Sequence, residues 1–423
     1  MSKIIEPLRG VHDVLPAQAP AWQHLERTAR EVFAAYGYEE FRVPIIEQTQ
    51  LFKRSIGDFT DIVEKEMFSF VDQGEDHITL RPEATAGIVR AMISNGLLRE
   101  NRLKVWCMGP MFRRERPQAG RYRQFHQIDA EAFGFAGPDI DAEMILLSAR
   151  LLRRLGLTRI ELLVNSLGTP AVRAAYRERL TAFFAAHESD LDEDSKRRLR
   201  TNPLRILDSK NREMQGLIAG APALLDELEA ESRAHFDALC AHLSGAGVAY
   251  RVEPRLVRGL DYYTRTVFEW TTDLLGAQST VCAGGRYDGL AAQLGGADTP
   301  GIGWAMGQER IVMLLDKQQA IPAERPQIYL VLVGELAERQ GLELAERLRD
   351  ARPDLRLQMN LGGGGFKAQF RRADKSGAEL ALVLAEDELA RGVAAIKWLR
   401  EERAQEDCPV EAISERLGLL LGL

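Results

Sequence analysis

Five arginines lie close together in one short stretch of an otherwise acidic chain. They surround one acid, Glu115, and they are Arg113, Arg114, Arg116, Arg121 and Arg123. A guanidinium group offers planar, paired donors to phosphate oxygens, which a flexible lysine cluster would provide less well. The cluster therefore predicts a phosphate-binding segment. For the arginines alone, a solvated basic loop is the favoured alternative.

The residues that follow add a second kind of chemistry. Phe125, Gln127 and Glu131 are separated by even numbers of residues, so on a strand they lie on one face. That face would present an aromatic ring, an amide and a carboxylate. Phosphate ligands, a stacking ring and an amine acceptor together indicate a site for a nucleotide and an amino compound.

A third polar stretch, Arg81–Thr85, stands at the start of an expected helix, Ala86–Asn95. Pro82 and Glu83 fit the chemistry of a helix start. Capping and ligand binding are equally supported for them.

Glycines and aromatic residues mark two later segments. Leu256–Glu269 places two tyrosines and an arginine before a strand, and Ala283–Gly289 ends the next strand in glycines. Glycines permit close approach of the backbone to a ligand, but for the glycines alone a tight turn is the favoured interpretation. Gly301–Arg310 then leads into a helix with Arg310 in its first turn. A lone arginine there is usually solvated, but its charge opposes the helix dipole, which indicates an anion nearby.

The elements that must position these residues follow from periodicity and turn signals. Val105–Phe112 and Tyr122–Glu131 form an antiparallel hairpin with its turn at Pro117–Gly120. Pro44, inside an expected strand at Glu40–Glu47, favours an edge or subunit interface that a second subunit could cover. The other expected elements before residue 169 are a helix at Trp22–Tyr36, a hairpin of Met67–Val71 with His77–Leu80, a helix at Asp141–Leu155 with Asp141 as its N-cap, and a strand at Arg159–Asn165.

The amino-acid composition changes at two points after residue 168. Residues 169–246 are charged, rich in alanine and helical, as in a helical insertion whose charge runs are solvated faces, with an RNA contact left open. Ile321–Pro326 is typical of a linker, and the strands and helices that alternate beyond it predict a small α/β domain with a parallel-type sheet and a last helix at Val410–Leu421. Gly362–Gly365 lacks the Gly-Lys-Ser/Thr of a phosphate loop, so we interpret it as a flexible crossover.

Composition limits the class of protein. The chain has 423 residues, enough for about three domains. It has no apolar run of membrane-spanning length and no secretion signal at its start, so we expect a cytoplasmic protein without membrane contact. Its four cysteines and seven histidines show no metal-binding spacing. We therefore assign no metal ligand, prosthetic group or structural disulfide, and the net charge of −7 argues against non-specific binding of nucleic acid.

Together these motifs resemble the histidyl-tRNA synthetases, a family of class II aminoacyl-tRNA synthetases, from Arg9 to the C-terminal domain. Phe41–Pro44 is similar to the first class motif, Phe112–Glu115 with Phe125 to the second, and Gly301–Arg310 to the third. Leu256–Tyr263 and Ala283–Asp288 are similar to the two peptides specific to the histidine enzymes. Two departures stand out: Cys107 occupies a position where an aromatic residue is usual, and Asp129 one where bacterial members often have glycine.

The resemblance implies a fold and a reaction. The fold is an α+β catalytic domain at residues 1–325 with a six-stranded antiparallel sheet flanked by helices and with the helical insertion at about 169–246. An anticodon-binding α/β domain at 326–423 follows, and the enzyme is a homodimer. The reaction joins L-histidine to tRNA(His) through a histidyl-adenylate made from ATP with Mg²⁺, releasing pyrophosphate and AMP.

The resemblance also implies roles for individual residues. Catalysis belongs to Arg258 and Arg113. Histidine would contact Glu83, Ala84, Thr85, Gln127, Glu131, Tyr262, Tyr263 and Tyr287. ATP would contact Arg113, Glu115, Arg121, Phe125 and Arg310. The hairpin tip, with Arg116, Gln118 and Arg123, would contact tRNA(His) and its extra 5′ guanosine.

Two other functions are compatible with parts of the sequence. A non-catalytic paralogue that regulates ATP phosphoribosyltransferase would lack the C-terminal domain and would have a degraded site, whereas Arg258, Glu83, Arg113 and Arg310 are all present here. A general RNA-binding protein would explain the arginines but not the polar pocket.

Overall fold

The computed structural model describes residues 4–57, 60, 62–99, 102–207, 209, 211–258, 260, 262–276, 279–318 and 325–422. The chain divides into two compact units, residues 1–321 and 322–423, each described by itself below. Most of the predicted linker at Ile321–Pro326 lies outside the described residues.

The first unit is built on an eight-stranded sheet in the order β1-β5-β6-β11-β10-β9-β7-β8. Its six central strands pair antiparallel, but β1 pairs parallel with β5, and β8 with β7. The expected purely antiparallel six-stranded sheet is therefore corrected to a mixed sheet with short parallel strands at both edges. The strands are β1 Glu39–Glu40, β5 Leu103–Phe112, β6 Gln124–Phe133, β7 Glu161–Ser166, β8 Arg251–Val252, β9 Thr264–Thr271, β10 Thr280–Arg286 and β11 Gly301–Gly307.

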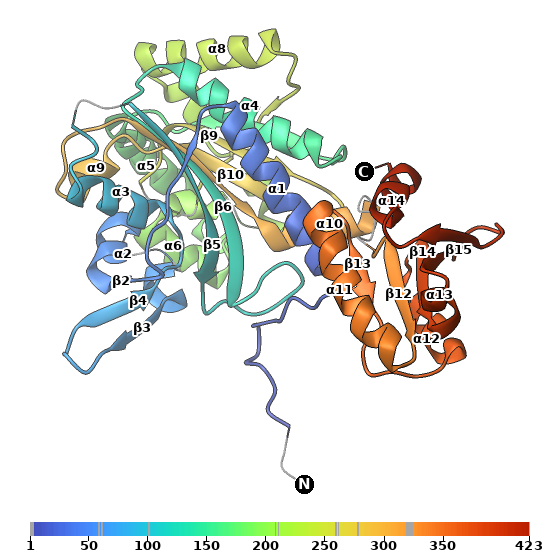
Figure 1. Ribbon diagram of the computed structural model, residues 1–423. Coiled ribbons are helices and arrows are strands. Elements are labelled where there is room, and N and C mark those ends of the chain that lie inside the picture. The colour runs from blue at the N-terminus through green and yellow to red at the C-terminus, as the bar shows by residue number, and fades with distance from the viewer. Residues whose placement is uncertain are drawn as a thin grey trace. The chain divides into compact units, whose positions relative to one another are not determined.

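One face of this sheet is covered by four helices, α1 Ala19–Ala35, α4 Pro138–Arg154, α8 Ala230–Gly245 and α10 Gln308–Gln318. Figure 1 shows α1 and α4 lying across the strands. Phe33 of α1 stacks on Trp106 of β5 with ring centroids 4.9 Å apart. Burial of such aromatic and aliphatic side chains stabilises the packing of these helices on the sheet. The four helices leave the opposite face of the sheet uncovered by this layer.

On the opposite side lie α3 and the helices between residues 170 and 227, which share a second core with the sheet. All the elements described between Pro170 and Gly245 are helical, as the composition predicts. The helices and short helical turns on this side are α3 Thr85–Ser94, α5 Pro170–Ala185, η2 Glu188–Asp190, α6 Glu193–Thr201, η3 Pro203–Ile206, η4 Arg212–Met214, α7 Gln215–Ala219, η5 Leu224–Glu227 and α9 Leu290–Gln293.

A small three-stranded sheet, β2-β4-β3, adjoins the first unit. The single strand expected at Glu40–Glu47 is wrong: the chain leaves β1 after Glu40 and enters β2 only at Ile46. Pro44 lies between them and cannot donate a ladder hydrogen bond, so the break falls where the sequence weakens a strand. The hairpin predicted from Met67 is confirmed. The elements here are β2 Ile46–Gln48, α2 Thr49–Ile56, η1 Ile62–Glu66, β3 Phe68–Val71 and β4 His77–Leu80.

The expected N-cap role of Asp141 is also wrong. Helix α4 starts at Pro138, and Asp141 lies inside it with no exposed surface. Its carboxylate accepts hydrogen bonds from Arg286 Nε at 3.1 Å and from Thr266 Oγ1 at 2.6 Å, and it pairs with His235 Nε2 at 2.7 Å. Asp141 therefore connects α4 and α8 to strands β9 and β10, a long-range role that a local capping pattern does not report.

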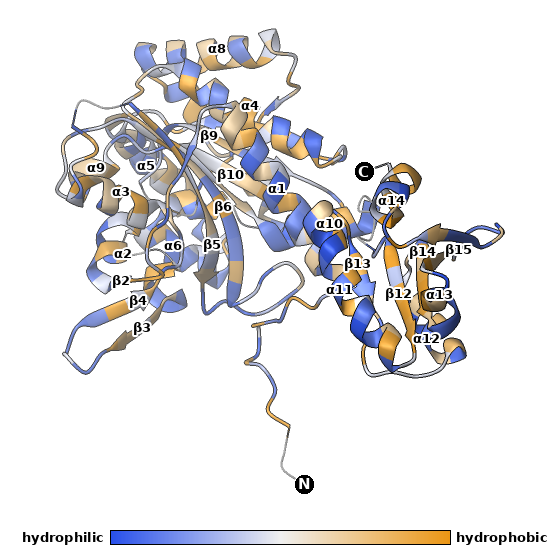
Figure 2. Cartoon of the chain, viewed as in Figure 1, coloured by the Kyte–Doolittle hydropathy of each residue, from blue (hydrophilic) through white to orange (hydrophobic). Residues whose placement is uncertain are grey.

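The second unit is an α/β domain with a five-stranded sheet in the order β13-β12-β14-β15-β16. The first three strands pair parallel, as predicted, but β15 and β16 add an antiparallel edge that the sequence analysis missed. Figure 2 shows apolar residues concentrated in β12 and mixed colouring on α11. The elements are β12 Ile328–Val333, α11 Glu335–Ala351, β13 Leu357–Met359, α12 Phe366–Ser376, β14 Leu380–Ala385, α13 Glu386–Ala390, β15 Val393–Trp398, β16 Glu406–Pro409 and α14 Ile413–Leu421.

Among the described residues, no helix is both long enough and apolar enough to span a membrane.

Candidate active site

A cavity of about 200 Å³ opens on the sheet face opposite α1 and α4. Its floor consists of small residues on β10 and β11, namely Ala283, Gly303, Ala305 and Gly307. These small side chains leave space above the sheet, and larger side chains would fill that space. The predicted hairpin supplies the wall, because β5 and β6 pair over their whole length and end in the arginine-rich tip.

Two glycines of β11 make room for recognition groups. A Cβ on Gly303 would lie 1.6 Å from Glu131 Oε2, and one on Gly301 would lie 2.4 Å from the Tyr287 ring. Gly284 and Gly285 lie inside β10, where a Cβ would meet a neighbouring strand's carbonyl oxygen at 2.1 and 2.5 Å. The tight-turn interpretation of these two is therefore wrong, since they allow close strand packing.

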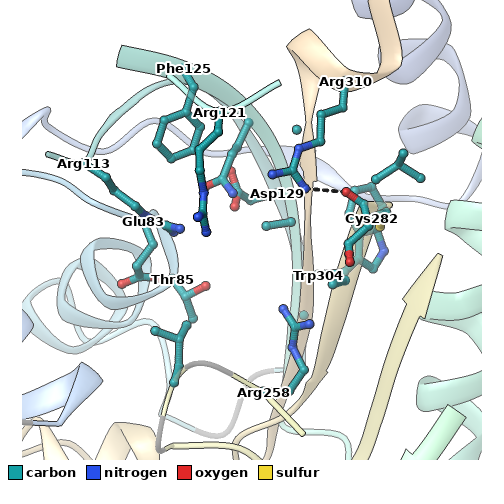
Figure 3. Close-up of a pocket in the computed structure, with 18 of the residues that line it drawn as sticks. Glu83, Thr85, Arg113, Arg121, Phe125, Asp129, Arg258, Cys282, Trp304 and Arg310 are labelled. Atoms are coloured by element: carbon teal, nitrogen blue, oxygen red, sulfur yellow. Dashed lines mark hydrogen bonds between the residues drawn. The ribbon is translucent and has the colours of Figure 1, made fainter. Parts of the chain in front are cut away.

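Three arginines meet at one end of the cavity: Arg113 and Arg121 from the hairpin and Arg310 from α10. Figure 3 shows them around the upper rim. Glu115 is buried and pairs with Arg121 and, at 3.7 Å, with Arg113. Burial and the nearby charge of Arg121 lower the pKa of Arg310. Three guanidinium groups around one carboxylate leave excess positive charge, as a polyphosphate site requires.

Phe125 lies beside this group on β6. The Arg113 guanidinium is 5.2 Å from its ring centroid, and Arg113 Nε donates to the Pro82 carbonyl oxygen at 2.9 Å. The ring and the guanidinium thus offer two flat surfaces at the mouth of the cavity, of the kind on which a base stacks.

Arg258 approaches from the opposite side of the cavity, as Figure 3 shows. It pairs with Glu269 of β9, and its guanidinium lies 5.7 Å from the centroid of the Tyr263 ring. Burial alone would lower the pKa of Arg258, but the charge of Glu269 and the tyrosines raise it. The residue is therefore a fixed, permanently charged donor facing the other arginines. Two neighbours in its peptide, Gly259 and Asp261, lie outside the described residues.

The remaining wall carries carboxyl and hydroxyl groups. Glu83 Oε1 accepts from the Ala86 N–H at 2.9 Å, so it caps α3, and it also lines the cavity. Glu131 accepts from Thr85 Oγ1 at 2.6 Å and from the Tyr287 hydroxyl. Burial raises the pKa of Glu83 and, more strongly, that of Glu131, while these hydrogen bonds oppose the shift.

Three tyrosines close the deep end. Tyr262 lies with its ring centroid 4.8 Å from that of Tyr263 and 5.6 Å from that of Tyr287, and all three line the cavity. Burial raises the pKa of each, so each stays protonated and can donate a hydrogen bond. Flat apolar faces with hydroxyl groups suit a small aromatic ring that carries polar atoms.

Among the described residues, Gln127 Oε1 and Arg258 Nε are buried polar atoms without a hydrogen-bond partner. Both side chains line the cavity. An unsatisfied buried acceptor or donor costs about 1–3 kcal/mol, so their position indicates that a ligand completes them.

Not every predicted residue reaches the cavity. Ala84 has no exposed surface and belongs to the core, while Glu131 contacts the cavity residues Thr85 and Tyr287 without being one of the lining residues. Arg116 and Gln118 are exposed at the hairpin tip, and Arg123, also outside the lining, donates its N–H to the Gly10 carbonyl oxygen at 2.7 Å. These three residues thus lie outside the cavity lining, whereas Gly120 and Arg121 of the same turn region line it.

Two acidic residues of the site, Glu269 and Glu309, were not predicted from the sequence, and Asp129 was predicted only as a departure from the family pattern. Glu269 pairs with Arg258, Asp129 lines the cavity, and Glu309 lines it while accepting from the His126 N–H at 2.9 Å. For Glu269 a signal exists: it is an acid at an even spacing from Val267 within a buried strand. No three histidine, cysteine or acidic side chains gather as a metal site among the described residues.

Comparison with known proteins agrees with this geometry. A family model described as histidyl-tRNA synthetase matches residues 10–311, and one described as an anticodon binding domain matches residues 327–418. The chain belongs to the histidyl-tRNA synthetase family. Within that family it is 56% identical over 422 residues to a curated histidine–tRNA ligase from Halorhodospira halophila, covering 99% of both chains.

Other members of the histidyl-tRNA synthetase family match over similar lengths. The histidine–tRNA ligase of Hydrogenovibrio crunogenus is 56% identical over 410 residues, which is 97% of this chain and 96% of that one. The apo histidyl-tRNA synthetase structure from S. aureus superposes with a TM-score of 0.82 at 32% identity, covering 98% of this chain and 100% of that chain. The α+β catalytic fold with a C-terminal anticodon-binding domain, predicted from the motifs, is thereby confirmed.

Proposed function

We propose that this chain joins L-histidine to tRNA(His) in two steps at the expense of ATP. The observation that carries the proposal is a single cavity with guanidinium groups at one end and a carboxyl–tyrosine pocket at the other. This arrangement is complementary to ATP beside histidine. A non-catalytic regulatory paralogue has no need of both ends.

In the first step the histidine carboxylate oxygen attacks the α-phosphate of ATP, a carboxyl–phosphate bond forms, and pyrophosphate leaves with its bonding electron pair. Arg113 and Arg258 would hold the α-phosphate and the carboxylate from opposite sides, while Arg310 would hold the distal phosphates. Preorganised donors of this kind stabilise charge that spreads in the transition state. Phe125 would stack on adenine, with Glu115 near its edge and Arg121 close to the phosphates.

The other end of the cavity would select histidine. Glu83, Thr85 and Gln127 would accept the α-ammonium group, and the unpartnered Gln127 Oε1 supports this role. Tyr262, Tyr263, Tyr287 and Glu131 would surround the imidazole. A site built to pair both ring nitrogens can reject isosteres that lack them by a factor of about 10⁴ or more.

Mg²⁺ would enter with ATP, because the described residues contain no cluster able to hold a metal alone. Bound by phosphate oxygens, Mg²⁺ would neutralise their charge. In the second step a hydroxyl of the terminal tRNA ribose attacks the histidyl carbonyl, and AMP leaves.

The proposal is tested by charging a tRNA mixture with each of the labelled amino acids in turn. We expect ATP-dependent, acid-precipitable label with histidine alone. Charging with a different amino acid, or none with histidine, would contradict it.

The domain division is part of the proposal. Residues 1–325 would carry out the chemistry, and residues 326–423 would read the anticodon, because all the cavity residues precede residue 311. We expect a fragment of residues 1–324 to retain histidine-dependent pyrophosphate exchange and to charge tRNA at least tenfold more slowly than the full chain. Equal charging by both would refute the division, and light scattering of both confirms that they share one oligomeric state.

We also infer a homodimer and a cytoplasmic location. The small sheet exposes Ile46 and Phe70, which are 51% and 47% accessible, together with Ile45 and Val71. An exposed apolar group on an edge sheet is typical of a surface that a second subunit covers. A monomeric mass at micromolar concentration would contradict the dimer.

The hairpin tip would read the acceptor end of the tRNA. Gln118 is exposed and its backbone bridges to Arg121, so the amide stands on a defined turn. Changing Gln118 to alanine should leave pyrophosphate exchange intact. It should raise the activation free energy of tRNA charging by about 1–3 kcal/mol, the scale of one base contact. The change should also narrow the difference between tRNA with and without the extra 5′ guanosine.

Gln73→Ala, an exposed glutamine in the turn between β3 and β4, is the matched control and should behave like the unaltered chain. If the ratio of charging rates for the two tRNAs is the same in Gln118→Ala and in the control, Gln118 does not read the extra base.

A further inference from the structure

Asp129 is a buried carboxyl group in the cavity to which the reaction above gives no role. We propose that Asp129 determines specificity by binding, together with Glu83, the ammonium group of the amino-acid substrate. The inference rests on the proposed function and deepens it, since it adds a ligand for one group of the substrate.

The position of Asp129 follows from strand geometry. It lies on β6 between Gln127 and Glu131, and side chains two residues apart on a strand share a face. On the neighbouring strand β11 its partner is Ala305, a cavity-floor residue. Asp129 is only 1% exposed, yet it lines the cavity, so its carboxyl group faces the ligand space and not the bulk solvent.

Cys107 and Asp129, the two departures from the family pattern, lie opposite each other in the sheet. Cys107 and Asp129 are direct cross-strand partners on β5 and β6, and Cys107 Sγ lies 3.8 Å from Asp129 Oδ2. Opposed side chains on an antiparallel pair compete for the same space. A small thiol at 107 therefore leaves the room that a carboxyl group at 129 occupies, and it supplies only a weak donor.

The charges around Asp129 leave it without a strong counter-ion. The titratable groups near it are Glu83, Glu131, Cys107, Cys282, Arg81 and Arg113. Arg81 directs its Nε and one terminal nitrogen to the carbonyl oxygens of Pro110 and Val43, at 2.9 and 3.0 Å. Arg113 donates to Pro82 and pairs with Glu115. The acidic wall can therefore accept a cation from a ligand, while Arg113, Arg121 and Arg310 line one end of the cavity. A zwitterion matches this separation of charge.

Binding of the ammonium group should change the protonation state of Asp129. Burial and the charge of Glu83 raise the pKa of Asp129 to about 8, so in the free protein near pH 7 the group is mostly protonated. A bound ammonium ion favours the carboxylate and lowers this pKa, so Asp129 releases its proton to the buffer. The affinity for histidine should therefore rise between about pH 6.5 and 8.

The experiment compares three ligands by titration calorimetry on the full chain and on the variants Asp129→Asn and Asp129→Gly. Histidine carries all groups, histidinol keeps the ammonium and imidazole groups but lacks the carboxylate, and imidazolepropionate lacks the ammonium group. Cys107→Ser is the matched control, because it alters the same cross-strand pair and keeps the carboxyl group. Each titration is repeated in two buffers of different ionisation enthalpy, which counts the protons released.

We expect both Asp129 variants to weaken histidine and histidinol roughly tenfold to hundredfold, as for a lost hydrogen bond to a charged group, and to leave imidazolepropionate unchanged. Proton release on histidine binding should fall relative to the unaltered chain and to Cys107→Ser. Equal weakening of all three ligands, or unchanged affinity for histidinol, would overturn the inference alone. Failure of the unaltered chain to bind histidine would overturn the proposed function as well.

Discussion

Replacing Arg258 with alanine is expected to abolish histidyl-adenylate formation while leaving the fold intact. Arg258 faces Arg113 across the cavity, its Nε has no partner within the part of the chain that the structure describes, and Glu269 fixes its orientation. Removing one preorganised donor from a developing charge typically costs about 3–4 kcal/mol, or roughly 10² to 10³ in rate. Because the variant also leaves Glu269 unpaired, the loss in this site should reach or exceed that range.

The measurement is single-turnover formation of the adenylate at saturating ATP and histidine. Arg255→Ala is the matched control, since Arg255 is exposed three residues earlier and lines no part of the cavity. Adenylate formation within threefold of the control by a folded Arg258→Ala protein would remove Arg258 from the catalytic residues.

Replacing Arg286 with methionine is expected to cause a large loss of stability in the first unit. Arg286 has no exposed surface, and its guanidinium donates to Asp141, to Asp288 Oδ1 at 3.0 Å and to the carbonyl oxygens of Phe135 and Gly137 at 3.0 and 2.9 Å. Breaking a buried pair by removing one partner costs about 3–5 kcal/mol, because it leaves an uncompensated charge.

The urea unfolding transition of the catalytic unit measures this loss. Arg251→Met is the matched control, because Arg251 pairs with Glu161 at the exposed surface, where such pairs contribute about 0–1 kcal/mol. The double variant Arg286→Met/Asp141→Leu should recover part of the stability, since it also removes the fully buried carboxylate that Arg286→Met leaves without its arginine. Equal stability of Arg286→Met and Arg251→Met would show that the buried network is not what holds α4 to the sheet.

The same network predicts an acid limit for stability. Burial alone would raise the pKa of Asp141, but the hydrogen bond with His235 and the charge of Arg286 lower it below its ordinary value. A carboxyl group with a depressed folded pKa contributes stability above its unfolded pKa of about 4 and loses that contribution as the pH falls through the folded value. The difference between Arg286→Met and the unaltered chain should therefore shrink in acid.

Local patterns were sufficient for the parts of the molecule that local physics determines. The hairpin with its arginines, the amphipathic helices and the parallel strands of the second unit follow from periodicity and turn residues, and the structure contains them. Motif resemblance supplied the fold class, which the family comparison confirms.

The rest depended on contacts between distant residues. Asp141 resembles a cap because the sequence does not reveal that Arg286, 145 positions later, takes its carboxylate. The two-residue strands β1 and β8 form only because they lie beside β5 and β7. Their own residues therefore do not indicate that the sheet is mixed. Asp129 and Cys107 were two separate departures until the strand register placed them opposite each other.

Histidine-dependent exchange of pyrophosphate into ATP, measured on the full chain without tRNA, tests the central claim most directly. The claim is that one cavity holds ATP among arginines and an amino acid among carboxyl groups and tyrosines. We expect exchange with histidine to exceed exchange with any other natural amino acid by a factor of about 10⁴. Exchange that is absent with histidine, or equally fast with another amino acid, would contradict it.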